Sequence, residues 1–153
     1  MQQKKIITTR QAIEKIKNYC ATREHCQSEV RSKLFDYQVN KDTIEDIICD
    51  LISEGYINEE RYAKAFVKGK FNIKHWGTLK IINHLKAKGI SQQCINIALA
   101  EIKNDDYQQK IELLIEKWLN THKNEQPIIR KYKLTRYLLS KGYSYEDFAD
   151  IIK

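Results

Sequence analysis

The sequence has very little proline and glycine. It contains one proline, Pro127, and five glycines in 153 residues. Because both residues interrupt or end helices, their scarcity favours a helical chain. Four glycines stand where a helix would begin or end: Gly55, Gly77, Gly89 and Gly142. Gly69 lies inside a helical stretch, where glycine costs about 1 kcal/mol relative to alanine. Alternating apolar and polar runs and Asn-Gly or Asp-Gly hairpin signals are also missing, so we expect an all-α protein.

Long apolar runs are missing too. No segment approaches the roughly 20 apolar residues that cross a bilayer, and Met1–Thr9 has no apolar core of a signal peptide. We therefore expect a cytoplasmic protein without membrane contact.

The few cysteines do not indicate a metal site. No two of them are separated by the two to four residues typical of zinc ligands; they are Cys20, Cys26, Cys49 and Cys94. His25-Cys26 is the nearest approach to a ligand pair, and Cys49, between Ile48 and Leu51, is expected to be a small buried residue. We expect reduced thiols, no metal and no cofactor.

Signatures of catalysis are also missing. The stretch Val67-Lys68-Gly69-Lys70 lacks the glycine spacing and the Ser/Thr of a phosphate-binding loop. We expect none of the four histidines to have a carboxylate or nucleophile partner at helical spacing; they are His25, His75, His84 and His122. The sequence therefore predicts a protein without enzymatic activity.

What the sequence does have is a repeat. A leucine is followed ten residues later by an apolar residue and four residues after that by another: Leu34, Ile44, Ile48; Leu85, Ile95, Leu99; and Leu138, Phe148, Ile152. The copies lie 51 and 53 residues apart. A period near 50 indicates one supersecondary unit used three times. Because about 50 residues is near the lower limit for an independent core, neighbouring units should stack on one another.

Each unit is predicted to hold three helices. The expected ranges are about 9–22, 26–37 and 42–54; 59–73, 78–88 and 92–102; and 106–122, 128–141 and 145–152. The third helices should be capped by Asp42, with Glu45 completing a capping box, by Ser91 and by Ser144. We therefore predict three tandem three-helix repeats, residues 1–56, 57–104 and 105–153, forming an elongated, curved, solenoid-like body.

Acidic residues are absent between Glu60 and Glu101, where eight Lys and Arg fall. The second helices are neutral or positive, +3 for residues 78–88 and +5 for 128–141, whereas the third helices are negative, −4 for 43–54 and −3 for 145–152. If the units stack in register, the positive helices share one face. The candidate partner-binding residues on it are Lys64, Lys68, Lys70, Lys74, Lys80, Lys86, Lys88, Arg130, Lys131, Lys133 and Arg136. A solvated surface without a partner is the alternative reading of this charge.

A competing reading is a DNA-binding helix-turn-helix formed by the second and third helices. The small residue needed where such helices cross is replaced by Leu34, Leu85 and Leu138. The would-be recognition helices also begin with carboxylates, at 42–46 and 144–147, which phosphates would repel. Nonspecific DNA contact through the lysine-rich middle repeat remains the alternative function.

Several stretches resemble a known family. They are EGYINEERYAKAFV at 54–67, KHWG at 74–77, REHCQSEV at 23–30, HLKAKGI at 84–90 and RYLLSKGYS at 136–144. Together they resemble the RecX family, bacterial regulators of the RecA recombinase, over essentially the whole chain. The chain departs from the family pattern at Thr78, where proline is usual, at Cys26, where serine is common, and at Leu79, where a basic residue is common.

The resemblance implies a non-enzymatic modulator that lies in the groove of the RecA–single-stranded-DNA filament. It implies that the protein lowers the ATPase, strand-exchange and coprotease activities of RecA. The expected partners are the RecA filament and nonspecifically bound DNA, and the protein is expected to be a monomer. Among the motif residues, Tyr62, Phe66 and Trp76 are interpreted as core. Arg61 is expected either to pair with a carboxylate such as Glu54 or Glu59 or to face a partner.

Overall fold

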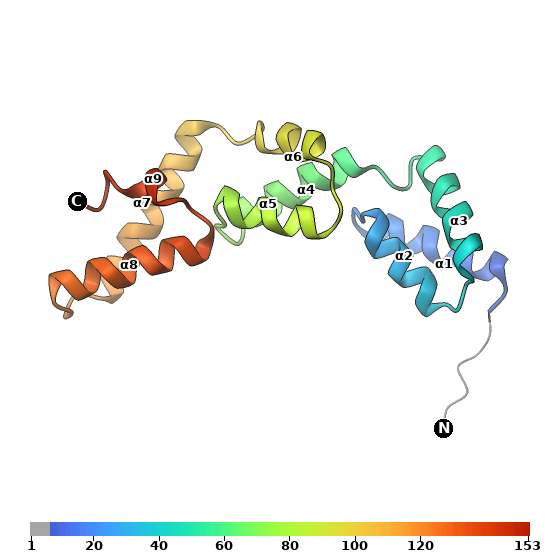
Figure 1. Ribbon diagram of the computed structural model, residues 1–153, viewed down its shortest axis with the longest axis horizontal. Helices are drawn as coiled ribbons and strands as arrows, with labels where there is room; N and C mark the ends of the chain where they lie inside the picture. Colours follow the sequence, from blue (N-terminus) through green and yellow to red (C-terminus); the bar gives the residue numbers. More distant parts are fainter. Residues whose placement is uncertain (1–6) are drawn as a thin grey trace, which may run out of the picture.

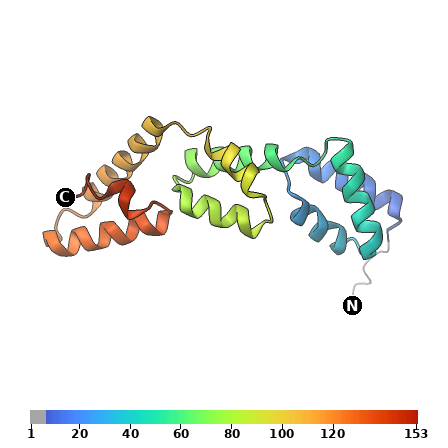
Figure 2. The same cartoon turned by 45° about the horizontal axis from the view of Figure 1, so that its top comes forward.

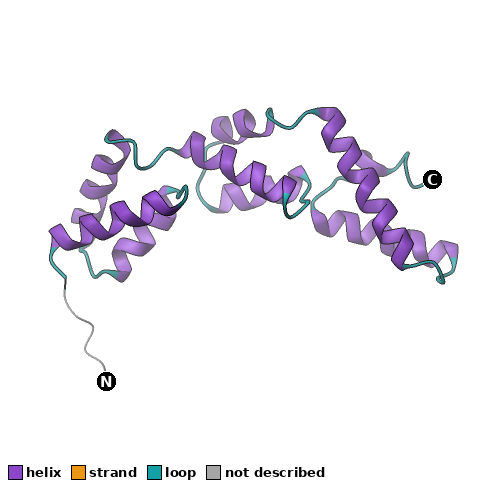
Figure 3. Cartoon of the chain, turned by 180° about the vertical axis from the view of Figure 1, so that it is seen from behind, coloured by secondary structure: helices purple, strands orange, loops and turns teal. Residues whose placement is uncertain are grey.

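The chain is helical throughout the part that the structure describes. A computed structural model describes residues 7–153, so residues 1–6, and with them most of the N-terminal stretch judged for a signal peptide, lie outside the description. Over 7–153 the prediction of an all-α protein is confirmed, with nine helices and no strand (Figure 1; Figure 3). The helices are α1 (Thr9–Thr22), α2 (Gln27–Asp36), α3 (Lys41–Ser53), α4 (Glu59–Asn72), α5 (Thr78–Ala87), α6 (Gln92–Leu99), α7 (Asn104–Thr121), α8 (Pro127–Lys141) and α9 (Tyr145–Phe148). Of these nine, not one combines the length and apolarity that crossing a membrane requires.

Each group of three consecutive helices packs around a hydrophobic cluster of its own. Leu34, Leu85 and Leu138 are fully buried, one in each cluster. The anchors ten residues further along are buried in the same clusters: Ile44, Ile95 and Phe148. The clusters follow one another along an elongated, arched body, as predicted from the repeat (Figure 1). Only α9 is much shorter than expected, because the chain leaves the helix after Phe148 in a turn.

The turn after the second helix has the same structure in all three units. Its left-handed residue is Gln38 (φ 63°) in the first unit, Gly89 (φ 80°) in the second and Gly142 (φ 99°) in the third. In each copy the next residue donates its backbone N–H to the carbonyl of the anchoring leucine, at 3.2, 3.1 and 3.2 Å. This is a Schellman ending, in which glycine is preferred because it has no Cβ. The first unit therefore carries a side chain where the other two have glycine.

The N-caps of the third helices follow directly on these turns. The side chains of Ser91 and Ser144 accept the backbone N–H three residues further on, so both predicted caps are confirmed. The prediction of Asp42 as a cap is wrong, because Asn40 takes that role and accepts the N–H of Thr43 at 2.9 Å. Asn40 is the second residue after the left-handed position, as Ser91 and Ser144 are, and Asp42 lies within the first turn.

Cys49 is exposed, so the expectation of a buried thiol was wrong. The buried positions of α3 are Ile44, Ile47, Ile48 and Leu51. Successive residues of a helix point about 100° apart, and Cys49 therefore turns away from the side that these residues bury. The fully buried thiol is that of Cys26, which packs in the cluster of the second unit.

The second helices of the three units lie end to end. At the start of α5, the backbone N–H groups of Gly77 and Leu79 donate to the carbonyls of Lys141 (2.8 Å) and Gly142 (3.0 Å) at the end of α8. At the start of α2, the Ser28 hydroxyl donates to the carbonyl of Lys88 at the end of α5, at 3.2 Å. Figure 1 shows α8, α5 and α2 in succession, and Figure 2 shows the same row from another angle. At the α5–α8 junction free backbone N–H groups thus meet free carbonyls, and at the α2–α5 junction a side-chain hydroxyl takes the place of the N–H.

The contact between α5 and α8 is close enough to require glycine on both sides. A Cβ on Gly77 would lie 2.4 Å from the carbonyl carbon of Gly142, and a Cβ on Gly142 would lie 2.3 Å from the Cβ of Lys80. Two backbones therefore touch directly at this junction.

Two tyrosines complete the same junction, of which Tyr143 is buried and Tyr107 is half-buried. The Tyr143 hydroxyl donates to the carbonyl of His75 at 2.8 Å. The Tyr107 hydroxyl accepts the N–H of Thr78 and donates to the Asp147 carboxylate, both at 3.1 Å. Burial raises the pKa of both phenols, so they remain protonated donors. These bonds hold the second and third units in one relative orientation.

Candidate partner-binding surface

The predicted basic residues of α4, and Lys74 just after its end, lie on two different sides of the helix. Lys64 and Lys68 line a cavity together with Glu101, which precedes α7, and Asp106, in the first turn of α7. Lys70 and Lys74 line a separate groove on the other side, with α1–α2 connection residues. The interval from Lys68 to Lys70 explains the division, because two residues turn a helix by about 200°. The structure therefore does not bring all four lysines to one face.

Lys64 is ion-paired within the chain. Its ammonium lies 3.2 Å from the Glu60 carboxylate and 3.5 Å from that of Glu101. The hydrogen bond to Glu60 raises the pKa of Lys64. The two glutamates bound the acid-free stretch of sequence, and folding brings both to this lysine. Lys64 consequently adds less positive potential to the surface than the sequence suggested.

Lys70 and Lys80 gather around Trp76. Their ammonium groups lie 4.9 and 4.5 Å from the centre of the Trp76 ring, within the range of a cation–π interaction. The rings of Phe66 and His84 pack against Trp76 with centroids 6.4 and 4.6 Å away. We call these five residues the Trp76 cluster. It joins α4 to α5. Of the three residues interpreted as core, Tyr62 is buried, whereas Phe66 and Trp76 are partly buried and pack against the same hydrophobic cluster.

One lysine of this region was missed from the sequence. The Lys141 ammonium, at the end of α8, donates to the carbonyl of Lys74 at 3.3 Å. The Lys80 ammonium similarly donates to the carbonyl of Ser140 at 3.4 Å. The signal for Lys141 was its place at the end of the basic stretch 128–141, but its nearness to Lys74 depends on how α8 docks on α5.

The four predicted residues of α8 divide into paired and unpaired side chains. Lys133 is ion-paired with Glu125. The Arg136 guanidinium lies 5.8 Å from the centre of the Tyr132 ring, on an exposed part of the helix. Lys131 is exposed as well, and Arg130 is half-buried. The exposed side of α8 also carries apolar side chains: Ile128, Ile129, Tyr132 and Leu139.

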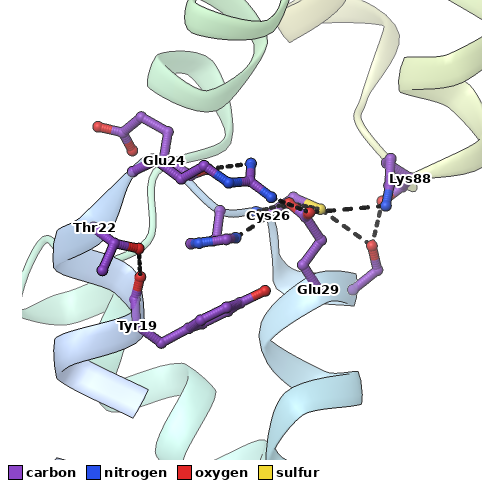
Figure 4. Close-up of polar contacts among 9 residues, drawn as sticks. Tyr19, Thr22, Glu24, Cys26, Glu29 and Lys88 are labelled. Atoms are coloured by element: carbon purple, nitrogen blue, oxygen red, sulfur yellow. Dashed lines mark hydrogen bonds and ion pairs between the residues drawn. The ribbon is translucent and has the colours of Figure 1, made fainter. Parts of the chain in front are cut away.

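Of the two predicted lysines at the end of α5, one is open to solvent and the other lies near a carboxylate of the chain. Lys86 is exposed. Lys88 takes part in the junction between the first and second units, where its ammonium lies 3.9 Å from the Glu29 carboxylate (Figure 4). Lys88 therefore serves packing between units, and Lys86 is open to a partner.

Arg61 pairs with a carboxylate, but with neither of the predicted ones. Its guanidinium forms an ion pair with Glu24 and donates to the carbonyl of Gly55 at 2.9 Å. Glu24 lies 37 residues earlier in the sequence, so no local pattern could have indicated it. Arg61 thus ties the connection between α1 and α2 to the start of α4.

The expectation that no histidine has a carboxylate partner at helical spacing was wrong for His25. Its Nδ1 lies 3.6 Å from the carboxylate of Glu29, four residues further on, and its ring stacks on Tyr19 at 3.7 Å between centroids. Burial, followed by the charge of Arg23, lowers the pKa of His25. Figure 4 shows Tyr19, Cys26 and Glu29 around this position.

Glu29 is the centre of this junction. Burial works to raise the pKa of Glu29, but the hydrogen bond from the Cys26 N–H and the charges of Lys88 and Arg23 outweigh it and lower the pKa. The Cys26 thiol lies 3.5 Å from the carboxylate and 3.1 Å from the Ser28 hydroxyl. Within 7–153, no three His, Cys, Asp or Glu side chains gather as a metal site would require. This group is best explained as a polar joint between the first two units.

Comparison with known proteins identifies the family of this chain. Residues 58–99 match the model of the second three-helix domain of RecX, and residues 105–152 match that of the third. The chain belongs to the RecX family. A protein named regulatory protein RecX from Clostridium botulinum is 33% identical over 129 residues, covering 83% of this chain and 60% of the relative. The Haemophilus influenzae protein of that name is 27% identical over 138 residues and is matched over 90% of both lengths.

Solved RecX structures have the same fold. The crystal structure of RecX from Lactobacillus salivarius superposes with a TM-score of 0.82 at 28% identity, covering 94% of both chains. A second RecX crystal structure, at 23% identity, gives a TM-score of 0.84 over 92% of this chain. The chain spans 60% of the length of the clostridial relatives, including that of Clostridium acetobutylicum.

Proposed function

We propose that this RecX-family protein is a non-enzymatic regulator of the RecA recombinase. It binds in the groove of the RecA–single-stranded-DNA filament and lowers the ATPase, strand-exchange and coprotease activities of RecA. It acts as a monomer in the cytoplasm, where the filament assembles. Membership of a family of regulatory proteins supports a binding role, and the row of α8, α5 and α2 is the observation that carries the proposal.

A row of three helices suits a repetitive partner. The bonds between α5 and α8 and between α2 and α5 make the row a continuous element, so its surface can meet more than one protomer of a filament at once. Surface ion pairs contribute only about 0.2–1 kcal/mol each. Several contacts on one rigid protein bind more tightly together than each does alone, because forming one contact raises the effective concentration for the next.

Among the predicted basic residues, we propose that the exposed ones make these contacts. Lys74, Lys86, Lys131 and Arg136 are exposed and lie on α5, on α8 or just after α4. None of them forms an ion pair within residues 7–153. Lys64, Lys88 and Lys133 are engaged with carboxylates of the chain and contribute less.

The direct test is ATP hydrolysis by RecA on single-stranded DNA. Adding the protein at substoichiometric amounts should make the hydrolysis rate decline with time, as filaments shorten or stop growing. An unchanged rate at every ratio up to a molar excess over RecA would contradict the proposal. Binding of the protein to labelled single-stranded DNA without RecA, measured in parallel, separates an effect on RecA from competition for DNA.

A matched pair of variants tests the surface. Changing Lys74, Lys86, Lys131 and Arg136 to glutamate takes the formal net charge from +7 to −1. Changing the exposed lysines 15, 41, 103 and 123 to glutamate reaches the same net charge elsewhere on the molecule. The first variant should lose inhibition and the salt dependence of binding, and the second should keep both. Equal losses would mean that only net charge matters.

A further inference from the structure

One side of α4 borders an open groove at the junction of the first two units. The groove measures about 340 Å³. It is lined by residues of α4, by the two residues that follow this helix and by two residues of the α1–α2 connection: Tyr62, Ala65, Phe66, Gly69 and Lys70; Ile73 and Lys74; and Arg23 and Glu24. Its lining is mostly apolar, and its charged groups stand at the ends of long side chains.

Gly69, in the middle of this lining, has no explanation within the fold. A Cβ built on it meets no atom within 4 Å, and its backbone is not left-handed. Gly77 and Gly142, by contrast, have backbone or Cβ atoms within 3 Å of where a side chain would begin. Glycine inside a helix is less stable than alanine. The chain thus forgoes helix stability at Gly69 and leaves open space there that its own packing does not need.

The apolar part of the groove is extended by Ile73, which stands one turn after Gly69. Its side chain is 73% exposed. Burying Ile73 and the neighbouring surface of Ala65 and Phe66 under a partner would remove apolar area from water, which favours association. The absence of a side chain at Gly69 allows another chain to come close to the helix there.

The charge around the groove is positive. Arg23 pairs with Glu29 at 3.3 Å and Glu24 pairs with Arg61, so the charges of the α1–α2 connection are compensated within the chain. Lys70 and Lys74 form no ion pair within residues 7–153, and they supply the positive charge of the groove. No further acidic residue occurs between positions 61 and 100 of the sequence. A matching occupant therefore combines an apolar side chain with carboxylates on either side of it.

A protein segment fits this groove better than a nucleotide base. Stacking of a base needs a free aromatic face. The Phe66 ring has the Lys70 ammonium 5.5 Å from its centre and packs against Tyr62 and Trp76. Tyr62 itself is only 4% exposed. The aromatic faces here are occupied from within the chain.

We propose that this groove is a docking site for a large apolar side chain carried on an acidic segment of a partner protein. The identity of that partner rests on the proposed function, according to which the acidic segment would belong to a RecA protomer. The chemistry of the site does not rest on that function.

The test fills the groove from within. Gly69→Leu places a side chain in the open space and improves helix propensity, so its melting temperature should equal or exceed that of the parent. Its affinity for RecA filaments on single-stranded DNA should fall at least tenfold, and Gly69→Ala should lie between the two. The matched control is Asn18→Leu, a neutral exposed position of α1 outside the groove, which should bind as the parent does. A stable Gly69→Leu protein with parental affinity would overturn the inference.

Two further probes separate this inference from the proposed function. One is a synthetic peptide in which a Phe-Leu pair is flanked on each side by three glutamates, compared with a peptide flanked by lysines. The parent protein could fail to bind RecA filaments and still bind the acidic peptide, with that binding abolished by Gly69→Leu. This result would support the groove as a docking site and contradict RecA as its partner. If the parent binds neither RecA nor the acidic peptide, the docking site is refuted. Oligothymidylate is the second probe, and an equal loss of its binding on Gly69→Leu would make the occupant a nucleic acid and overturn the inference.

Discussion

Adding one methyl group to Gly142 tests whether the α5–α8 contact holds the second and third units together. Gly89 is the matched control, since it occupies the equivalent left-handed position of the second unit at φ 80°, against 99° for Gly142. A Cβ on Gly89 meets no atom within 4 Å, whereas one on Gly142 would lie 2.3 Å from the Cβ of Lys80.

The two alanine variants should therefore differ by the energy of the junction alone. Both suffer the strain of a left-handed alanine, about 1–2 kcal/mol. Gly142→Ala must also move α8 away from α5, which breaks the hydrogen bonds from Gly77 and Leu79 to the carbonyls of Lys141 and Gly142. At about 0.5–1.5 kcal/mol for each bond, the additional loss is about 1–3 kcal/mol.

Urea and thermal denaturation measure this difference. At about 2–4 °C per kcal/mol for a chain of this size, Gly142→Ala should melt roughly 2–12 °C below Gly89→Ala. Solution scattering should show a change in the maximum dimension of Gly142→Ala and none for Gly89→Ala. Equal melting temperatures and unchanged scattering would refute the argument that direct backbone contact fixes these two units.

Three other predictions concern stability and exposure. Gln38→Gly should stabilise the protein by about 0.5–1 kcal/mol in urea denaturation, because relief of left-handed strain exceeds the entropy lost by glycine; a destabilised variant would contradict this. The folded chain lowers the pKa of His25, so the unfolded chain takes up the proton first, and stability should fall as the pH drops through about 6.5. The fall from pH 7.5 to 5.5 should be smaller in His25→Phe, and an identical fall would exclude His25 as its cause. In thiol labelling followed by mass spectrometry, the exposed Cys49 should react first and the buried Cys26 last; the reverse order would mean that the first two units separate.

Local features of the fold were predictable because their causes are local. The anchors Leu34, Leu85 and Leu138 were identified by spacing alone and are buried, since a 3.6-residue period decides which side of a helix is apolar. Ser91 was identified as a cap because a short hydroxyl before a helix accepts a free N–H. Asp42 was misjudged because Asn40, two residues earlier, competes for the same role and follows the turn directly.

The candidate surface was less predictable, because charges that are distant in sequence meet in space. A stretch without acids predicted a free Lys64, yet Glu60 and Glu101 reach it from the two ends of that stretch. Arg61 pairs with Glu24 across 37 residues. The Glu60–Lys64 pair has the i, i+4 spacing of a helix and was predictable. The Glu101–Lys64 and Glu24–Arg61 pairs were not, since each depends on how one unit or helix packs against another.

The sequence by itself determined the helices, their threefold repetition and the family, because propensity, apolar periodicity and motif spacing act within about one unit. Only the tertiary structure decided that α8, α5 and α2 lie end to end and that the lysines of α4 divide between two sides. The physical reason is that the orientation between units depends on a few contacts, such as Gly77 against Gly142 and Ser28 on Lys88, whose partners lie 60 or more residues apart.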